Sequence, residues 1–227
     1  MPPRCPRRPA RRRIVERDPI SSPARNLDSA QEHRRVSLTT EPLGTFAGRQ
    51  PLVVTPTMHG DDRGFFLERH KASAYLPHGI GPFLQDNHSR SVRGVLRGLH
   101  WQVPPHAQGK LVSVLAGRIL DVAVDVRQDS PTFGRWASAV LDDDTHRQLW
   151  VPEGYAHGFL VLSDVADVHY KTTAEYARER ERSLRWNDPD VNVAWGVDAP
   201  LLSDKDAAAP FLRDLVAADL FPWENDV

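Results

Sequence analysis

A regular alternation of apolar and polar residues between positions 111 and 126 constrains the fold more than any other stretch of the chain. The sequence there reads LVSVLA, then the pair Gly117-Arg118, then ILDVAVDV, which predicts two strands around a tight turn. Side chains two residues apart in a strand share a face. The second strand therefore has an apolar face made of Leu120, Val122, Val124 and Val126.

The chain beyond this stretch continues the same pattern. Short β-type runs, WASAVL, RQLWV, GFLVLS and DVHYK, are separated by the turn segments DDD, PEG and SD, and residues 52–54 predict an earlier strand. Strands spaced about 8–12 residues apart, with turn residues between them, are typical of an all-β sandwich or barrel. The exception is Asp206–Leu220, whose pattern predicts a short C-terminal helical segment with Pro210 in its first turn.

The first 45 residues differ in composition from the rest. Residues 1–35 hold ten arginines against four acidic residues, a charge of +6, whereas the remainder has 19 basic and 26 acidic residues, a charge of −7. Residues 1–45 show no sustained apolar period, so we expect them to be a disordered basic extension, and we expect residues 46–227 to form one domain. The charge of that domain argues against nucleic acid as a partner.

Cysteine content and hydropathy indicate the compartment. The single cysteine, Cys5, cannot form a disulfide within the chain, which suits a reducing compartment. The sequence has no run of about 18 apolar residues that would span a membrane. No signal-peptide core follows the early arginines. We therefore expect a soluble, cytoplasmic protein.

Polar groups are dense in the stretch 85–115, as expected of the wall of a site. Leu96, Gly98 and His100 share a face by alternation, so His100 is predicted to point into the barrel. There it is either a hydrogen-bonded core histidine or a general base that works near neutral pH. Arg97 is predicted to lie on the opposite face unless Gly98 marks a bulge.

Three other side chains each have two interpretations. Lys110 is either a surface lysine or an inward cation that stabilises negative charge on an oxygen. Tyr170, on an inward face of its strand, is either a packed core residue or a proton donor. Asp206 either belongs to a capping pattern with Ser203 or orients His100 through its carboxylate. The residues alone leave these alternatives open.

PEGYAHGF places His157 between two glycines, where it is an ordinary turn residue or a metal ligand. Metalloproteins of the cupin type combine such a histidine with an earlier H-x-H and a glutamate. The earlier run here is HWQ, so at most two imidazoles remain, fewer than the three protein ligands usual for a catalytic metal. We expect no metal. Paired N–H donors of Arg63, Arg97 and Arg147 either bind phosphates or belong to ordinary surface residues.

Longer blocks resemble one known family. HGDDRGFFLE, QDNHSRS, GVLRGLHWQ, QGKLVSVLAGRILDVAVDVR, SPTFGRW, RQLWVPEGYAHGFLVLS, YKTT, WNDP and LSDKDAAAP resemble, in this order, the dTDP-4-dehydrorhamnose 3,5-epimerase family across roughly residues 46–212. The resemblance implies a metal-free, cupin-type jelly roll that works as a homodimer. It also implies epimerisation of a dTDP-4-keto-6-deoxyhexose at C3 and C5, without a cofactor, in deoxysugar biosynthesis.

The resemblance implies roles for individual residues. His100 resembles the general base of the family, and Asp206 resembles the partner of that base. Tyr170 resembles the general acid, and Lys110 resembles the residue near the keto oxygen. The positions that resemble substrate-binding residues are Arg63, Glu68, Gln85, Asp86, Asn87, Arg97, His157, Glu181 and Lys205. The family often has an aromatic pair shortly after the YK motif, where this chain has Glu175-Tyr176, so Tyr176 alone remains.

Several functions are compatible with these motifs. Double epimerisation is the leading hypothesis. A 3- or 5-monoepimerase of an antibiotic deoxysugar pathway would share the motifs, and a sugar 3,4-ketoisomerase would use the fold with its acid and base placed differently. A non-catalytic nucleotide-sugar-binding cupin is disfavoured because all four proposed catalytic residues are present. A metal-dependent cupin enzyme is disfavoured by the count of imidazoles.

Overall fold

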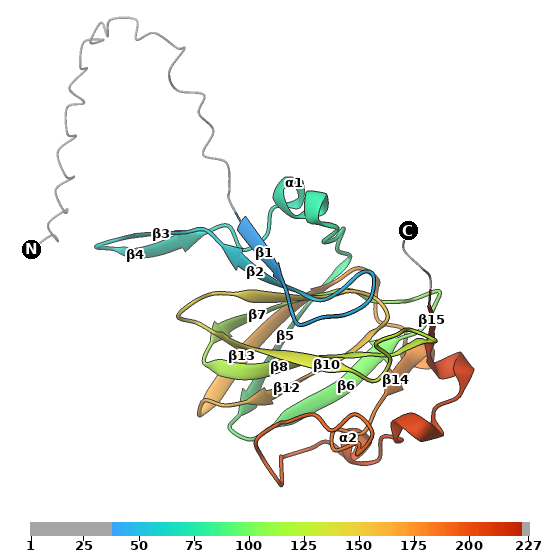
Figure 1. Cartoon of the computed structure of the whole chain (residues 1–227). Coiled ribbons are helices and arrows are strands. Elements are labelled where there is room, and N and C mark those ends of the chain that lie inside the picture. The colour runs from blue at the N-terminus through green and yellow to red at the C-terminus, as the bar shows by residue number, and fades with distance from the viewer. Residues whose placement is uncertain (1–37, 224–227) are drawn as a thin grey trace, which may run out of the picture. The chain divides into compact units, whose positions relative to one another are not determined.

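Two antiparallel sheets packed face to face form the body of the molecule (Figure 1). The computed structural model describes residues 38–223, and the predicted all-β, jelly-roll type of fold is confirmed. The six-stranded sheet has the order β1 (Leu38–Pro42), β2 (Leu52–Pro56), β11 (Gln148–Val151), β7 (Lys110–Ala116), β13 (Val165–Thr172) and β5 (Gln85–Val92). The five-stranded sheet has the order β10 (Trp136–Asp142), β8 (Arg118–Asp125), β12 (Tyr155–Val161), β6 (Leu96–Gln102) and β14 (Glu181–Ser183).

Smaller elements connect these sheets or lie beside them. The small strands are β3 (Met58–Asp61) and β4 (Gly64–Leu67), which form a hairpin, and β9 (Arg127–Gln128) and β15 (Phe221–Pro222), which pair in parallel. The α-helices of residues 38–223 are single turns, α1 (Ala72–Tyr75) and α2 (Asp204–Ala207). The 3-10 turns of the same residues are Leu76–His78, Arg178–Arg180, Leu212–Asp214 and Ala217–Asp219.

Alternation within the strands builds three apolar layers. The inner layer lies between the sheets and includes Val112 of β7 and Ile119 of β8. The outer face of the five-stranded sheet is covered by residues 184–221, and the apolar face predicted for the second strand packs there: Leu120, Val122, Val124 and Val126. Tyr75 and Ile80 belong to the third layer, on the outer face of the six-stranded sheet. Each fully buried aliphatic side chain contributes about 1.5–3 kcal/mol, so these layers hold the sandwich together.

The helix predicted over Asp206–Leu220 is wrong in its length. The chain there makes only the single turn α2 and two 3-10 turns. Pro210 follows α2 instead of lying in its first turn, because proline lacks an N–H and disfavours helical geometry in the residue before it. The segment instead lies along the five-stranded sheet, where Leu212, Leu215 and Leu220 pack against the outer layer.

The sequence assigns residues 38–45 to the N-terminal extension, but the structure places them in the domain. β1 pairs with β2 along its whole length, from Leu38 opposite Pro56 to Pro42 opposite Leu52. This strand was missed because LTTEP has no apolar run, and its place in the sheet comes from backbone hydrogen bonds to β2. The rest of the predicted disordered extension, residues 1–37, lies outside the described residues.

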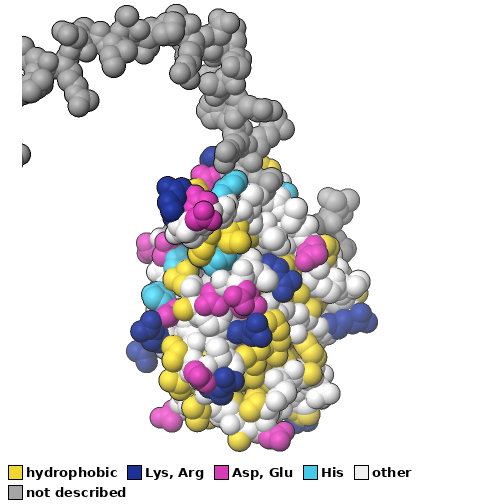
Figure 2. All heavy atoms as spheres, turned by 90° about the vertical axis from the view of Figure 1, so that its left-hand side faces the viewer, with side chains coloured by type: hydrophobic (Ala, Val, Ile, Leu, Met, Phe, Trp, Pro, Cys, Tyr) yellow, Lys and Arg dark blue, Asp and Glu magenta, His cyan; other side chains and the backbone are white. Residues whose placement is uncertain are grey.

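The surface and the helices of the described part of the chain bear on two partners that the sequence argues against, membrane and nucleic acid. Between residues 38 and 223, no helix combines the length and apolar character needed to cross a bilayer. On the face shown in Figure 2, acidic, basic and apolar side chains are interspersed. That face therefore lacks the continuous basic stripe that binds a nucleic-acid backbone.

Candidate active site

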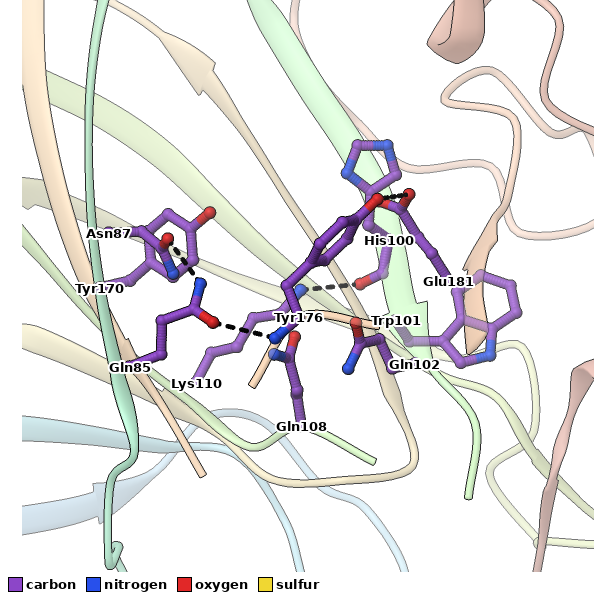
Figure 3. Close-up of a pocket in the computed structure, with 10 residues that line it drawn as sticks. All are labelled: Gln85, Asn87, His100, Trp101, Gln102, Gln108, Lys110, Tyr170, Tyr176 and Glu181. Carbon is purple, nitrogen blue, oxygen red and sulfur yellow. Dashed lines mark hydrogen bonds between the residues drawn. The ribbon is translucent and has the colours of Figure 1, made fainter. Parts of the chain in front are cut away.

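A polar cavity with two arms lies between the sheets, and the arms meet at His100, Lys110 and Tyr170. The first, the Tyr176 arm, has a volume of about 300 Å³ and is also lined by Gln85, Asn87, Gln102, Gln108, Tyr176 and Glu181 (Figure 3). The second, the His157 arm, has a volume of about 290 Å³ and is also lined by Ser89, Arg97, His157, Phe159, Lys205 and Asp206. The cavity thus brings together residues that lie far apart in the sequence.

A β-bulge at Gly98 decides which side chains of β6 face the cavity. His100 pairs with His157 of β12, and the next pair along the ladder is Arg97 with Phe159. Two residues of β6 therefore stand opposite one residue of β12, and the alternation of faces reverses across the bulge. Gly98 has a φ of 119°, a backbone conformation that side-chain-bearing residues rarely adopt.

The bulge brings Arg97 and His100 to the same side of β6, where both line the cavity. Leu96 is buried instead in the apolar layer on the outer face of the five-stranded sheet. The prediction that Leu96 and His100 share a face is therefore wrong, because it assumed unbroken alternation, whereas the alternative of a bulge at Gly98 is confirmed. A Cβ atom on residue 98 would lie 2.6 Å from the Cα of Gly158, so only glycine fits there.

His100 forms a hydrogen-bonded pair with Asp206 of α2. Nε2 of His100 lies 2.6 Å from Oδ1 of Asp206, and Ser203 donates to Oδ2 at 2.8 Å. Burial pushes the pKa of Asp206 up, but the hydrogen bonds from His100 and Ser203 outweigh it and hold this pKa below its ordinary value. The ionised carboxylate accepts from Nε2–H, which leaves Nδ1 of His100 as the basic nitrogen. Burial lowers the pKa of His100 despite the Asp206 charge, so the imidazole is neutral near pH 7.

Lys110 is an inward cation rather than a surface lysine. Its side chain begins β7 and is buried, with 8% of the residue exposed. Nζ donates to the carbonyl oxygen of His100 at 3.0 Å, which leaves two ammonium hydrogens for other acceptors. Burial lowers the pKa of Lys110 to about 8, against the attraction of Glu181 and Asp121. A cation therefore lies beside the base within the cavity.

Tyr170 enters the cavity from β13, in the sheet opposite the one that carries His100. Figure 3 shows the two side chains on different sides of the cavity, with Lys110 extending between them. Burial raises the pKa of Tyr170 and the charge of Arg97 opposes that shift, so the phenol stays protonated at neutral pH and can donate. The predicted inward orientation of this ring is confirmed.

His157 lies in β12 and has a carboxylate partner that sequence reasoning missed. Its Nε2 lies 2.6 Å from Oδ1 of Asp121, a residue of β8 that is fully buried. The sequence did carry a signal for this partner: Asp121 places a carboxylate inside the apolar run ILDVAVDV, and a buried charge requires a partner. Gln102 and Gln108 also line the cavity and were missed, since a single glutamine in a strand or loop carries no pattern of its own.

Glu181 of β14 connects two sides of the cavity. It accepts from the Tyr176 hydroxyl at 2.9 Å and from Nζ of Lys205 at 2.5 Å. Burial pushes the pKa of Glu181 up, but the hydrogen bonds from Lys205 and Tyr176 outweigh it and hold that pKa below its ordinary value. Gln85 and Asn87, two residues apart on β5, both face the Tyr176 arm, and Gln85 donates to Asn87 at 2.9 Å.

Three of the residues predicted to bind substrate lie away from the cavity of their own chain. Asp86 points to the outer face of β5, where it accepts from Lys171 at 2.7 Å, because neighbouring residues in a strand face opposite ways. Arg63 lies in the turn of the β3–β4 hairpin with its side chain 89% exposed. Glu68 follows β4 and lies 3.7 Å from Lys71.

The arginines proposed as phosphate ligands are separated by the fold. Arg97 lines the His157 arm, and its Nε donates to Ser91 at 3.0 Å. Arg147 donates to the carbonyl oxygen of Val140 at 3.2 Å, in β10 of the five-stranded sheet. Arg97 and Lys205 thus place two cations in the His157 arm, beside Lys110, which suits an anionic ligand.

The histidines of the cavity are each engaged with a carboxylate. Within residues 38–223, no group of three or more His, Cys, Asp or Glu side chains is arranged to hold a metal ion. His100 is paired with Asp206, and His157 is paired with Asp121. That the protein works without a metal or cofactor stays a prediction.

Comparison with known proteins identifies the family. The family model described as dTDP-4-dehydrorhamnose 3,5-epimerase matches residues 49–214, more than half of the chain. The chain belongs to this family. A curated member, the dTDP-4-dehydrorhamnose 3,5-epimerase of Shigella flexneri, is 51% identical over 173 residues, which cover 75% of this chain and 93% of that relative.

Solved structures of dTDP-sugar epimerases share the fold of this family member. The Legionella pneumophila dTDP-6-deoxy-D-glucose-3,5-epimerase, in complex with dTDP-4-keto-L-rhamnose, has a TM-score of 0.76 and 44% identity, over 83% of this chain and 100% of that one. ChmJ, a 3'-monoepimerase from Streptomyces bikiniensis in complex with dTDP-quinovose, has a TM-score of 0.68 and 38% identity, over 72% and 84% of the two chains. The predicted enzyme class, isomerase, is that of the family.

Proposed function

We propose that this protein epimerises a dTDP-4-keto-6-deoxyhexose at C3 and C5, of the type that converts dTDP-4-dehydro-6-deoxy-D-glucose to dTDP-4-dehydro-L-rhamnose. The observation that carries the proposal is the meeting of His100, Lys110 and Tyr170 in one cavity, from three strands in two facing sheets. A base on one side and an acid on the other are what inversion of a carbon requires.

The proposed reaction begins at the His100 dyad. Nδ1 of His100 takes a proton from the carbon beside the keto group, and the electrons of that C–H bond form an enolate whose negative charge lies on oxygen. Lys110 stabilises this oxygen as a preorganised cation in a site shielded from water. Asp206 stabilises the imidazolium that forms, as in other base–carboxylate pairs.

Inversion is completed from the opposite sheet. The Tyr170 phenol donates its proton to the other face of the enolate carbon, which restores the ketone with the opposite configuration. His100 is then protonated and Tyr170 is a phenolate, and exchange with water returns both to their starting states. In this reaction the carbonyl of the substrate accepts the electron pair of the C–H bond. His100 and Tyr170 account for the proton removed and the proton returned.

The two arms of the cavity suit the two parts of the substrate. The sugar must lie where the arms meet, within reach of His100 and Tyr170. The Tyr176 arm offers amide side chains and an aromatic ring, which suit a nucleotide base. Arg97 and Lys205 line the other arm, so they offer hydrogen-bond donors to oxygens of the sugar on the side away from the nucleotide.

Incubation with dTDP-4-keto-6-deoxyglucose in deuterated water tests the function. Deuterium at both C3 and C5, with inverted products seen by NMR, is the expected result, because both protons are returned from solvent-exchangeable groups. Label at C3 alone would favour the monoepimerase alternative, which the likeness to ChmJ keeps in view. Product with the keto group moved would indicate a ketoisomerase. Binding without any exchange would leave only a nucleotide-sugar-binding protein.

We expect kcat/KM to follow a bell-shaped pH profile. Activity should fall on the acid side below pH 6.5, because burial lowers the pKa of His100 and only its neutral form accepts a proton. Activity should fall on the alkaline side near pH 8, where Lys110, with a pKa of about 8, loses its charge. In Lys110→Arg the alkaline fall should move to higher pH, measured from initial rates. An unmoved alkaline limb in that variant would assign the limb to another group.

We also propose that the protein works as a homodimer. The β3–β4 hairpin projects away from the two sheets (Figure 1) and exposes Met58, Phe65 and Phe66, which are 49%, 56% and 67% exposed. Apolar surface of this kind marks protein contacts. A second copy would cover these side chains and could receive Arg63, which does not reach the cavity of its own chain. Light scattering at twice the 25.5 kDa chain mass supports the dimer, and a mass of one chain counts against it.

A further inference from the structure

The segment after β13, residues 173–177, borders the Tyr176 arm without belonging to a strand or helix. The N–H of Thr173 donates to the carbonyl oxygen of Gly109 at 3.0 Å, and beyond this residue glutamine side chains hold the backbone. Nε2 of Gln108 donates to the carbonyl oxygen of Ala174 at 2.7 Å, and the backbone N–H of Tyr176 donates to Oε1 of Gln85 at 2.9 Å. This part of the cavity wall therefore depends on side chains from other elements for its position.

Gln102 of β6 makes the most extensive of these contacts. Its Nε2 donates to the carbonyl oxygens of Glu175 at 3.2 Å and His106 at 2.6 Å, and its Oε1 accepts from the N–H of Ala177 at 2.7 Å. The residue is 2% exposed. An amide group has two N–H donors, and both of these are directed at backbone carbonyls. Gln102 thus lines the cavity with its donor hydrogens already engaged.

Tyr176 lies between the two residues of the segment that Gln102 binds, Glu175 and Ala177. Its hydroxyl donates to Glu181 at 2.9 Å, and its ring borders the cavity although half of the residue is exposed (Figure 3). A half-exposed ring keeps one orientation only when its backbone is held. The position of this ring therefore depends on two amides: Gln85 binds the N–H of Tyr176 itself, and Gln102 binds the residues on either side of it.

We propose that Gln102 is a positioning residue, which holds segment 173–177 so that Tyr176 forms the wall against which the nucleotide of the substrate binds. The proposal rests on the proposed function, because it takes the ligand of the Tyr176 arm to be a nucleoside diphosphate. An aromatic ring on a fixed backbone binds a base at lower entropic cost than a mobile ring. Gln102 acts on affinity through Tyr176 and takes no part in moving protons.

The test is Gln102→Met, which keeps the length of the side chain and removes its polar groups. The dissociation constant for dTDP, measured by calorimetry, should rise about tenfold or more, since both hydrogen bonds from Gln102 to the segment, at Glu175 and Ala177, are lost. KM should rise with it, whereas kcat at saturating substrate should change little, because the reacting groups are untouched. A fall in kcat as large as the rise in KM would overturn the proposal.

A double-mutant cycle with Tyr176→Ala isolates the route of the effect. If Gln102 acts through Tyr176, adding Gln102→Met to Tyr176→Ala should weaken dTDP binding no further. Fully additive losses in the double variant would overturn the proposal. Should Gln102→Met fail to fold, Gln108→Met is used in the same cycle, because it removes one bond to the same segment.

Gln148→Met is the matched control. Gln148 is 1% exposed, and its amide donates to the Arg69 carbonyl at 3.0 Å and to Ser113 at 2.8 Å, in the apolar layer away from the cavity. It should lose stability but keep wild-type affinity for dTDP. Equal losses of affinity in the two glutamine variants would overturn the proposal. A wild-type protein that neither binds dTDP nor exchanges substrate protons would instead contradict the proposed function.

Discussion

Replacing His100 with alanine is expected to lower kcat by about 10²–10⁴-fold, the usual contribution of a general base. The variant removes the imidazole that Asp206 holds at 2.6 Å where the two arms meet; His157 forms a similar pair with Asp121, but it lines only the His157 arm. Substrate binding should survive, because Arg97 and Lys205 remain. The measurements are kcat by product NMR and deuterium incorporation at C3 and C5, both of which should fall together.

His88→Ala is a suitable control for this variant. His88 is also paired with an aspartate, at 3.1 Å from Asp167, but it lies on the outer face of β5. We expect wild-type kcat for the control and a cooperative thermal unfolding transition, which shows a folded protein, for both variants. A His100→Ala protein that still incorporates deuterium at the wild-type rate would rule out His100 as the base.

Tyr170→Phe is expected to separate proton removal from inversion. The variant keeps the ring and loses only the hydroxyl, so His100 can still take a proton and return one to the same face. Inversion should fall by about 10²–10⁴-fold, the range for loss of a general acid, with the stronger effect at C5. Deuterium exchange without inversion should therefore continue, visible as labelled but unepimerised substrate. KM should stay near that of the wild type.

Tyr75→Phe provides the matched control for the loss of a phenol. The Tyr75 hydroxyl donates to Gln148 at 2.7 Å in the apolar layer on the outer face of the six-stranded sheet, away from the cavity. Its removal should cost about 1–3 kcal/mol of unfolding free energy through the unpaired amide, with no change in epimerisation. Equal rates of inversion at both carbons in Tyr170→Phe and the wild type would exclude Tyr170 as the acid.

The sandwich could be predicted from sequence because its strands carry their own signal. Alternation located β8, and turn residues separated β10, β11, β12 and β13. β1 and β5 escaped prediction for a common reason: their residues are largely polar, and their place depends on pairing with β2 and β13. A strand that is stabilised mainly by backbone pairing with its neighbours has no apolar alternation from which it could be predicted.

The candidate site was predictable in its reacting groups but not in its geometry. The positions of His100, Tyr170 and Asp206 followed from motif blocks, whereas the faces of β6 depended on one bulge. Odd and even residue numbers mark the two faces of a strand only while the strand is regular. A single extra residue at a bulge exchanges the faces for all residues beyond it. Partners such as Asp121 come from another strand, so no local spacing reveals them.

The contact between two glycines at the crossing of β6 and β12 limits how this enzyme can be redesigned. A Cβ on Gly158 would come within 2.8 Å of the carbonyl oxygen of Arg97, and a Cβ on Gly98 would strike Gly158. Variant libraries aimed at new sugars should therefore leave this crossing untouched, since any larger side chain would force apart the strands that carry both histidine dyads.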